Sequence, residues 1–297
     1  MRNNFSIKQC MLLRGIMLSV VITITSSCAK EEEPSTVSTA DLSIATLVAK
    51  VNSETYKAHN FNDGQLDPFT EDQGFTGTDI YGEGMSFQRD FTGGKRLKLV
   101  WKESEYDGSR RERGHEIKLG VNNNDEIYTG FYLFIPSGQN NNLLNKNTII
   151  WQLYNWNTDG CSNWTAHLEL KGKALYLSYR NACVSPTVVK ILDGIETDKE
   201  LAFQIRAVLS GTNRGTLAVV LDGEIIVDLK NINLGFGSFD ANDNAETSVA
   251  GVKMGMYCFD TANYTPDETR ILYLDNVSSS ARSGSVGNSL DKVDPRK

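Results

Sequence analysis

The hairpin signal at Asp222-Gly223 constrains the fold more than any other segment of the sequence. It separates two short runs rich in apolar residues, 216–221 and 224–229, and an Asp-Gly dipeptide between such runs is typical of a two-residue β-turn. Similar runs, with turn residues between them, occur at 128–135, 148–154, 164–170, 174–180, 201–209, 252–257 and 270–277. No long segment has a helical period. We therefore expect an all-β chain with at least nine strands, folded as a two-sheet jelly roll or sandwich.

The N-terminal segment has the pattern of a secretory signal. Basic residues Arg2, Lys8 and Arg14 precede an apolar run at 16–24, and small residues follow up to Cys28. The apolar run is too short for a membrane-spanning helix. The sequence Thr25-Ser26-Ser27-Cys28 resembles a bacterial lipobox, which implies lipidation of Cys28 and an outer-membrane lipoprotein exposed on the cell surface. An ordinary signal peptide with a coincidental cysteine is the alternative.

These features divide the chain into four expected parts. Residues 30–33 are Lys-Glu-Glu-Glu, which resembles the acidic export tag of bacterial surface lipoproteins. We expect a signal peptide at 1–27, a polar tether at 28–52, one folded domain at 53–279 and a frayed polar tail at 280–297. A domain of about 240 residues is large enough for one β-sandwich core.

The net charge of −7 argues against nucleic acid as a partner, because phosphate binding favours a basic surface. One segment is nevertheless rich in cations, with Arg110, Arg111, Arg113 and His115 close together. If this segment is a strand, alternation puts Arg111, Arg113 and His115 on one face. Such a row is suited to carboxylates or sulfates. The alternative is a structural network of ion pairs among residues 110–116. We expect the protein to be a monomer.

The cysteines of the mature chain are Cys28, Cys161, Cys183 and Cys258. The runs at 164–170 and 175–179 flank a tight turn at 171–173, which predicts a second hairpin. Cys161 and Cys183 are equidistant from Gly172 at its centre, so we expect them to form a disulfide. Cys258 is then a free, buried thiol. No spacing of cysteine and histidine predicts a zinc site.

Two of the expected strands combine an apolar face with a chemically capable one. In 150–154, Gln152 and Tyr154 alternate with apolar residues. In 252–257, Lys253, Gly255 and Tyr257 alternate with apolar residues that we assign to the core. Glycine on the polar face leaves room for a ligand near the backbone.

Taken in order, these segments resemble the signature strands of the jelly-roll polysaccharide lyases, a group that includes alginate lyases, glucuronan lyases, heparin lyase I and some ulvan lyases. Those families have an Arg-x-Glu strand, then Gln-x-His, then Lys-x-Gly-x-Tyr near the C-terminus. The resemblance covers about residues 60–277, with Lys253-Met254-Gly255-Met256-Tyr257 as its most specific element. Tyr154 departs from the pattern, because it stands where many relatives have histidine. The resemblance implies a concanavalin A-like sandwich and a catalytic domain at 53–279.

The resemblance also implies a reaction, the β-elimination of a uronic-acid glycoside in an anionic polysaccharide, with no cofactor required. The enzyme has to neutralise the C6 carboxylate before the C5 proton can leave. Arg111, Arg113 and Gln152 are the candidates for this role, and Arg110 competes with Arg111 if a bulge at Gly114 shifts the register. Tyr257 is the principal acid and base candidate, with Tyr154 or His115 as its partner. Lys253 and His167 are further candidates for binding the substrate.

Each role has a structural alternative. Tyr257 can be a core tyrosine, Tyr154 a platform on which a sugar stacks, and His115 an ordinary surface histidine. A structural calcium ion is a weaker expectation, carried by oxygen-rich turns at Asp63 and Asp275.

Two other functions remain open. One is a lectin-like glycan-binding protein on the same scaffold, and the other is a hydrolase of the laminarinase type. The Glu-x-Asp-x-x-Glu pattern of the hydrolases is absent from the sequence. The sequence does not identify the polymer.

Overall fold

The computed structural model describes residues 54–73, 85–89, 94–121, 126–138, 140–155, 164–181, 183–235, 239, 250–282 and 290–297. These residues belong to one compact unit, Ser43–Lys297. The signal peptide, the tether, Cys28 and Cys161 lie outside the described residues, so the predictions made for them stay predictions. No helix in the described part of the chain is long and apolar enough to cross a membrane.

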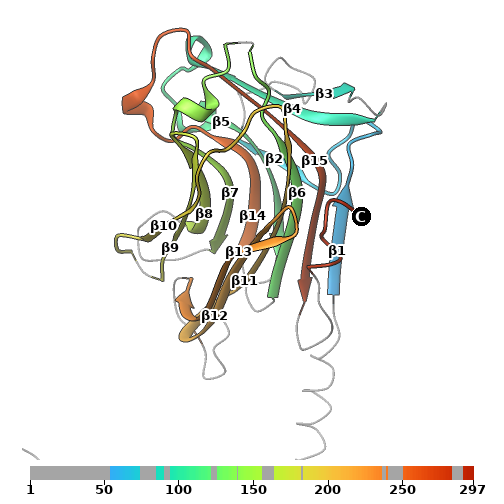
Figure 1. Cartoon of the computed structure of the whole chain (residues 1–297), viewed down its shortest axis with the longest axis vertical. Coiled ribbons are helices and arrows are strands. Elements are labelled where there is room, and N and C mark those ends of the chain that lie inside the picture. The colour runs from blue at the N-terminus through green and yellow to red at the C-terminus, as the bar shows by residue number, and fades with distance from the viewer. Residues whose placement is uncertain are drawn as a thin grey trace, which may run out of the picture. The chain divides into compact units, whose positions relative to one another are not determined.

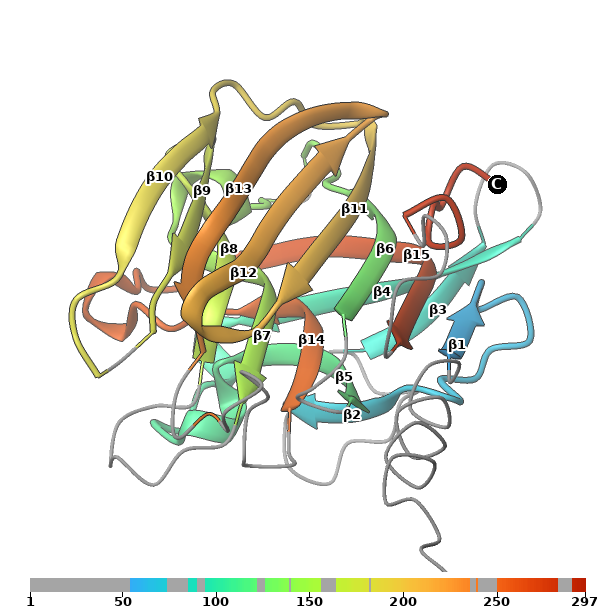
Figure 2. The same cartoon turned by 90° about the horizontal axis from the view of Figure 1, so that it is seen from below.

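The described part of the chain forms two antiparallel sheets (Figures 1 and 2). All nine predicted strands are present, and the all-β prediction is confirmed. The eight-stranded sheet has the order β13 (Glu224–Leu234), β12 (Ser210–Leu221), β11 (Glu200–Val208), β6 (Glu126–Phe134), β15 (Thr269–Arg282), β4 (Lys95–Lys102) and β3 (Met85–Arg89), with β1 (Glu54–His59) also paired to β15. The seven-stranded sheet has the order β10 (Thr187–Leu192), β9 (Ala174–Tyr179), β8 (Trp164–Lys171), β7 (Thr148–Asn155), β14 (Ala250–Tyr257), β5 (Gly114–Val121) and β2 (Thr70–Gln73).

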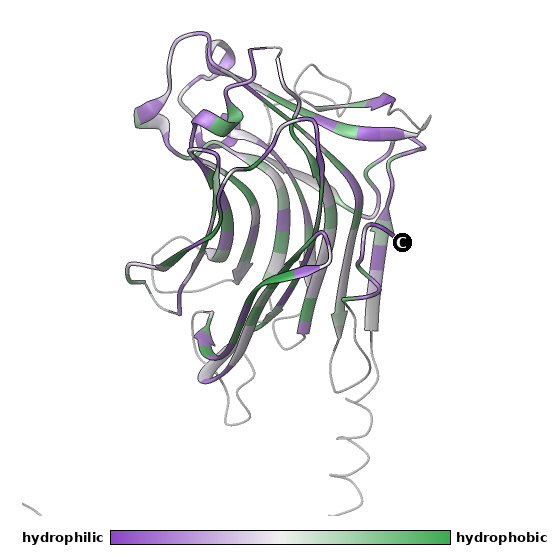
Figure 3. Cartoon of the chain, viewed as in Figure 1, coloured by the Kyte–Doolittle hydropathy of each residue, from purple (hydrophilic) through white to green (hydrophobic). Residues whose placement is uncertain are grey.

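Alternating side chains place one apolar face of each sheet in a common core. Hydrophobic and hydrophilic residues alternate along the strands in Figure 3. Trp101 and Phe131 from the larger sheet and Trp151 and Met254 from the smaller one are buried in the same cluster. Each fully buried side chain of this size contributes about 1.5–3 kcal/mol through the hydrophobic effect. The other face of the seven-stranded sheet is left for polar residues.

The two predicted hairpins are confirmed by their turn geometry. Asp222 and Gly223 have φ values of +53° and +92°, and β12 pairs with β13 across them. Gly172 and Lys173 have φ values of +58° and +65° between β8 and β9. Positive φ at both central residues is the signature of a type I′ turn, whose twist matches that of the flanking strands.

The segment before β5 is not a strand, which corrects the prediction for residues 110–113, whereas residues 114–116 are strand as predicted. Arg110–Glu112 form the 3-10 helix η2, and β5 begins at Gly114. Two hydrogen bonds hold this conformation: the Trp101 indole donates to the Glu112 carbonyl at 2.8 Å, and the Asp107 backbone amide donates to the Glu112 carboxylate at 3.0 Å. The alternation assumed for Arg111, Arg113 and His115 therefore does not apply. Three further 3-10 turns lie at Glu103–Glu105 (η1), Leu143–Asn145 (η3) and Thr261–Asn263 (η4).

The C-terminal end also differs from the prediction of a frayed tail. Strand β15 continues to Arg282, and residues 290–297 pack against the domain. Val293 is fully buried, and its carbonyl oxygen lies 1.6 Å from where a Cβ of Gly130 would be. The Gln204 amide donates to the Leu290 carbonyl at 2.7 Å. Hydrogen bonds to backbone carbonyls and the buried Val293 side chain hold this segment in place. Its polar composition does not indicate these contacts.

The two cysteines of the mature domain that the structure describes differ in state. Cys258 is a free and fully buried thiol, as predicted. Burial raises its pKa to about 12, which excludes it as a nucleophile near neutral pH. Cys183 is disulfide-bonded, but Cys161 is outside the described residues, so that pairing stays a prediction.

Candidate functional site

A row of polar side chains crosses the face of the seven-stranded sheet that is turned away from the core. Gln152 on β7 is the Cα partner of Lys253 on β14 and of His167 on β8. Lys253 is in turn opposite Lys118 on β5, and His167 is opposite Ser178 on β9. Directly opposed residues share one face of a sheet. Five neighbouring strands therefore contribute to a single polar row, which we call the cationic row after Lys118 and Lys253.

The predicted division of β14 into two faces is confirmed. Val252, Met254 and Met256 are all fully buried in the core. Lys253 and Tyr257 are half-buried on the opposite face. The strand thus presents the lysine and the tyrosine of its motif on the same side as Gln152.

A buried hydrogen bond spans β14 beside this row. The Gln152 side-chain amide donates to the carboxylate of Glu116 on β5, and the two residues are only 7% and 1% exposed. Glu116 is opposite Gly255 on β14. Because the Glu116 carboxylate accepts a hydrogen bond from the Gln152 side-chain amide, Glu116 fixes the orientation of that amide.

Tyr154 lies at one end of this polar face. The Lys253 ammonium is 5.2 Å from the centroid of its ring, within the range of a cation–π contact. On the neighbouring strand β8 its partner is Trp164, whose ring is 3.7 Å from the Arg180 guanidinium. Burial lowers the pKa of Arg180. Tyr154 is therefore flanked by a lysine on one side and by an aromatic–arginine pair on the other.

Tyr257 lies at the opposite end of β14, where it pairs with Gly114 and Ile149. Arg113, the residue before β5, donates a hydrogen bond to the Tyr106 hydroxyl at 3.3 Å. Hydrogen bonding to Tyr106, and to a smaller extent to Tyr257, raises the pKa of Arg113 above its usual range. Tyr257 therefore has a permanently charged guanidinium beside its hydroxyl.

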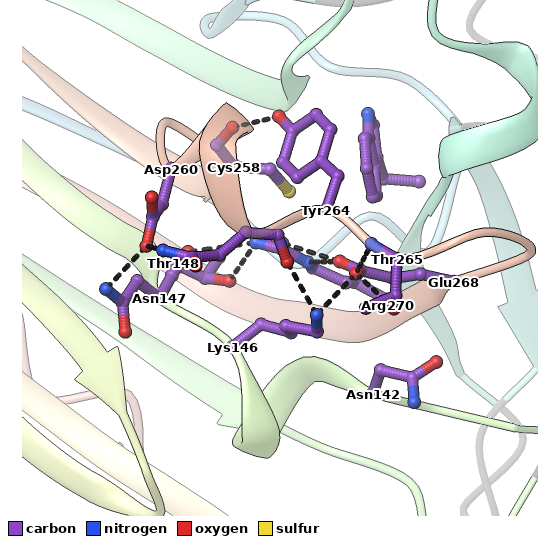
Figure 4. Close-up of polar contacts among 12 residues, drawn as sticks. Asn142, Lys146, Asn147, Thr148, Cys258, Asp260, Tyr264, Thr265, Glu268 and Arg270 are labelled. Atoms are coloured by element: carbon purple, nitrogen blue, oxygen red, sulfur yellow. Dashed lines mark hydrogen bonds and ion pairs between the residues drawn. The ribbon is translucent and has the colours of Figure 1, made fainter.

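A buried polar network supports the segment that follows Tyr257 (Figure 4). Arg270 is fully buried and donates to Glu268 at 2.7 Å, to the Asn147 carbonyl at 2.9 Å and to the Thr148 hydroxyl at 2.9 Å. The Glu268 carboxylate also forms an ion pair with the Lys146 ammonium, at 2.9 Å. Burial alone raises the pKa of Glu268, but these partners hold it below its usual range.

The same network fixes the end of β14. The Tyr264 hydroxyl donates to the Cys258 carbonyl, and the Cys258 amide donates to the Arg113 carbonyl at 2.5 Å. The Tyr264 ring packs on Trp101, with 4.5 Å between centroids. Tyr257 is therefore held from both sides, by β5 and by the Cys258–Arg270 segment.

His115 is not part of the polar face, which corrects its assignment as a proton-transfer residue. It is opposite Met256, faces the core and is 1% exposed. The reason is that alternation along β5 puts His115 on the same face as Ile117 and Leu119, the apolar residues that this strand buries in the core. Burial lowers the pKa of His115 to about 4, against the smaller opposing effect of a hydrogen bond with the Val100 backbone.

This burial predicts acid sensitivity. A histidine has a pKa of about 6.5 in the unfolded chain, so between about pH 6.5 and about pH 4 the unfolded state binds a proton that the native state excludes. Stability is therefore full above this window and falls as the pH is lowered through it. Urea denaturation at about pH 7.5 and about pH 4.5 measures how much the free energy of unfolding decreases between the two pH values. This decrease should be about 2–3 kcal/mol smaller in His115→Leu than in wild type. An unchanged loss in His115→Leu contradicts the prediction.

Arg110 and Arg111 are also placed differently from the prediction. Both are exposed on η2, before the strand begins, and neither belongs to the strand face that carries Glu116 and Lys118. The Arg-x-Glu segment at 110–112 is therefore a 3-10 turn. Arg113 is the arginine that the structure brings beside Tyr257.

The sequence reasoning missed Lys118 and Glu116 as members of the polar face. Alternation counted from Gly114 finds both, because residues 116 and 118 then face away from Ile117 and Leu119. His167, a candidate for binding the substrate, lies on the same face of the sheet, opposite Gln152. Its ring is 4.5 Å from that of Trp164, another residue that the sequence reasoning missed.

Metal binding finds no further support among the described residues. No group of three or more His, Cys, Asp or Glu side chains there is arranged to hold an ion. The Asp63 carboxylate accepts a hydrogen bond from the backbone amide of Gln65 at 2.9 Å. The Asp275 carboxylate accepts one from the backbone amide of Asn276 at 2.8 Å. The structural calcium ion stays a prediction.

Comparisons with known proteins show the fold. No family model and no curated protein matches the sequence. Among solved structures, an endo-β-1,4-glucuronan lyase from the fungus Trichoderma reesei is 17% identical in sequence, with a TM-score of 0.56. The match covers 77% of this chain and 98% of the chain of the glucuronan lyase. Alginate lyase A1-II′ is 13% identical over 68% of this chain and 85% of its own, with a TM-score of 0.46. The first likeness confirms the predicted two-sheet jelly-roll sandwich.

Proposed function

We propose that the protein is a polysaccharide lyase that cleaves a uronic-acid-containing anionic polysaccharide by β-elimination on the outer face of its seven-stranded sheet. One observation carries this proposal: Lys118, Lys253 and Gln152 are aligned in register across three strands. Lys118 and Lys253 occupy directly opposed positions on this face, so an anion bound there is attracted by both positive charges. The fold shared with a glucuronan lyase supports the same conclusion.

The chemistry requires the substrate carboxylate to be neutralised. Removal of the C5 proton leaves negative charge that the C6 carboxylate disfavours unless cations or amide donors face it. The lysines of the cationic row supply charge, and the Gln152 amide supplies a donor whose orientation Glu116 fixes. Arg113 supplies a further positive group at the Tyr257 end of the face.

Two phenols are available for proton transfer. One group has to take the C5 proton and one has to protonate the C4 oxygen as that bond breaks, and one tyrosine serves both steps when the two atoms lie on the same side of the ring. We propose Tyr257, beside Arg113, and Tyr154, beside Lys253, for these roles. Each phenol lies next to a cation, within reach of the face where the carboxylate of the substrate would bind.

The direct test is incubation of the purified protein with glucuronan, alginate, ulvan and heparin while the ultraviolet absorbance of the unsaturated product is followed. We expect at least one uronate polymer to give increasing absorbance. Lys253→Met should raise KM on that polymer by about tenfold, because one charged contact is worth about 1–2 kcal/mol. Lys230→Met, an exposed lysine on β13, is the matched control and should leave KM unchanged. Absence of product from all four polymers would falsify the proposal.

A second candidate is a lectin-like protein that binds the same polymers without cleaving them. One departure favours it, because Tyr154 stands where the family pattern has histidine. Tight binding of a uronate polymer in a titration calorimeter, without any unsaturated product, would establish this alternative.

A further inference from the structure

Tyr154 lies over a strand position that has no side chain. Its partner on β14 is Gly251, and a Cβ atom at Gly251 would lie 2.3 Å from the Tyr154 hydroxyl oxygen, 2.4 Å from its Cζ and 2.7 Å from its Cε1. Non-bonded carbon atoms in proteins are about 3.5–4.0 Å apart. The phenol therefore occupies the volume that any other side chain at position 251 would need.

The backbone does not require glycine at this position. Gly255 and Gly114 have φ values of +139° and +138°, in the region that favours glycine, whereas Gly251 has no positive φ. A Cβ at Gly255 would also meet the His115 carbonyl oxygen at 2.3 Å, while the atoms nearest to a Cβ at Gly251 all belong to the Tyr154 side chain. Glycine within a strand often marks a close approach of another group. At position 251 that group is the Tyr154 phenol.

Two neighbours define where the phenol can go. Lys253, on the same strand face as Gly251, has its ammonium 5.2 Å from the ring centroid, and Trp164 is the partner of Tyr154 on the other side. A methyl group at position 251 would displace the Tyr154 ring, and the Tyr154 hydroxyl would then no longer lie above β14. The position of this hydroxyl therefore depends on Gly251.

We propose that Gly251 is a positioning residue, which holds the Tyr154 hydroxyl above β14 and beside Lys253 for proton transfer. This inference rests on the proposed function and extends it to a residue that carries no functional group. Its effect is exerted only through Tyr154.

Steady-state kinetics of Gly251→Ala test the proposal. We expect kcat to fall about 100-fold, as in Tyr154→Phe, because both variants remove the hydroxyl from its place. KM should stay within about threefold in both. The combined variant should be no slower than Tyr154→Phe alone, because the two changes act on one group. The matched control is Gly211→Ala on β12, in the eight-stranded sheet. A Cβ at Gly211 would lie 2.7 Å from the Phe239 ring, and this variant should keep the wild-type kcat.

Two kinetic outcomes overturn the inference: a wild-type kcat in Gly251→Ala, or losses that multiply in the combined variant. A measurement independent of activity covers the case in which wild type cleaves none of the polymers or Gly251→Ala does not fold. In the NMR spectrum of wild type, the α-protons of Gly251 should be shifted by the Tyr154 ring, and Tyr154→Leu should abolish that shift. If Tyr154→Leu leaves the Gly251 resonances in place, the phenol does not lie over Gly251.

Discussion

Replacing Arg270 by methionine is expected to lower the free energy of unfolding by about 3–5 kcal/mol, because it removes one partner of a buried ion pair. The Arg270 guanidinium is fully buried between Glu268 and the rings of Trp101 and Tyr264, whose centroids lie 5.0 Å and 5.4 Å from its central carbon. Without it, the Glu268 carboxylate keeps only its contacts with Lys146 and Thr265. Guanidinium denaturation with linear extrapolation measures the loss.

Two further variants separate the ion pair from a general effect of mutation. Lys230→Met breaks an exposed pair with Asp228, in which the side chains are 62% and 43% exposed, and should cost at most about 1 kcal/mol. The double variant Arg270→Met/Glu268→Leu should recover part of the loss, because it leaves no buried carboxylate short of partners. A loss below about 1 kcal/mol in Arg270→Met itself would show that the network contributes little to stability.

The sequence predicts those parts of this fold that local patterns determine. At Asp222-Gly223 the turn chemistry alone requires positive φ at both positions, and the hairpin is present. In β14 the alternation of apolar Val252 and Met254 with Lys253 identifies both faces correctly, since the pleat puts successive side chains on opposite sides. The polar face of the candidate site follows from the same rule.

The prediction of a strand was wrong for residues 110–113, whereas residues 114–116 belong to β5. The Glu112 carbonyl accepts a hydrogen bond from the Trp101 indole, and Gly114 has a φ of +138°, neither of which is visible in a short window of sequence. The core face of β5 is the one that carries Ile117 and Leu119, so His115 is buried with them, whereas Lys118 lies on the opposite face, in the cationic row.

The packing of residues 290–297 was equally hidden. Hydrogen bonds to the Leu290 and Pro295 carbonyls, from Gln204 and Asn276, hold a segment whose side chains are mostly polar. Backbone acceptors are common to every residue, so composition contains no signal for such contacts.

Replacing Tyr257 by phenylalanine is expected to lower kcat on the cleaved polymer by about 10²–10⁴-fold, the usual contribution of general acid–base catalysis. The substitution keeps the ring at the end of β14 and removes only the hydroxyl beside Arg113. KM should change by less than about threefold, since the cationic row that binds the carboxylate is intact. Initial rates from the ultraviolet absorbance of the product, with polymer binding measured separately by calorimetry, give both quantities.

The matched control for Tyr257→Phe is Tyr106→Phe, because Arg113 contacts the hydroxyls of both tyrosines. Tyr106 packs edge-on against Tyr264, with 5.2 Å between the ring centroids, on the supporting side of Arg113. Its substitution loosens the guanidinium without removing a proton-transfer group, so kcat should fall less than about tenfold. If Tyr257→Phe retains more than about a tenth of the wild-type kcat, Tyr257 is not the principal acid and base, and Tyr154 carries both proton transfers.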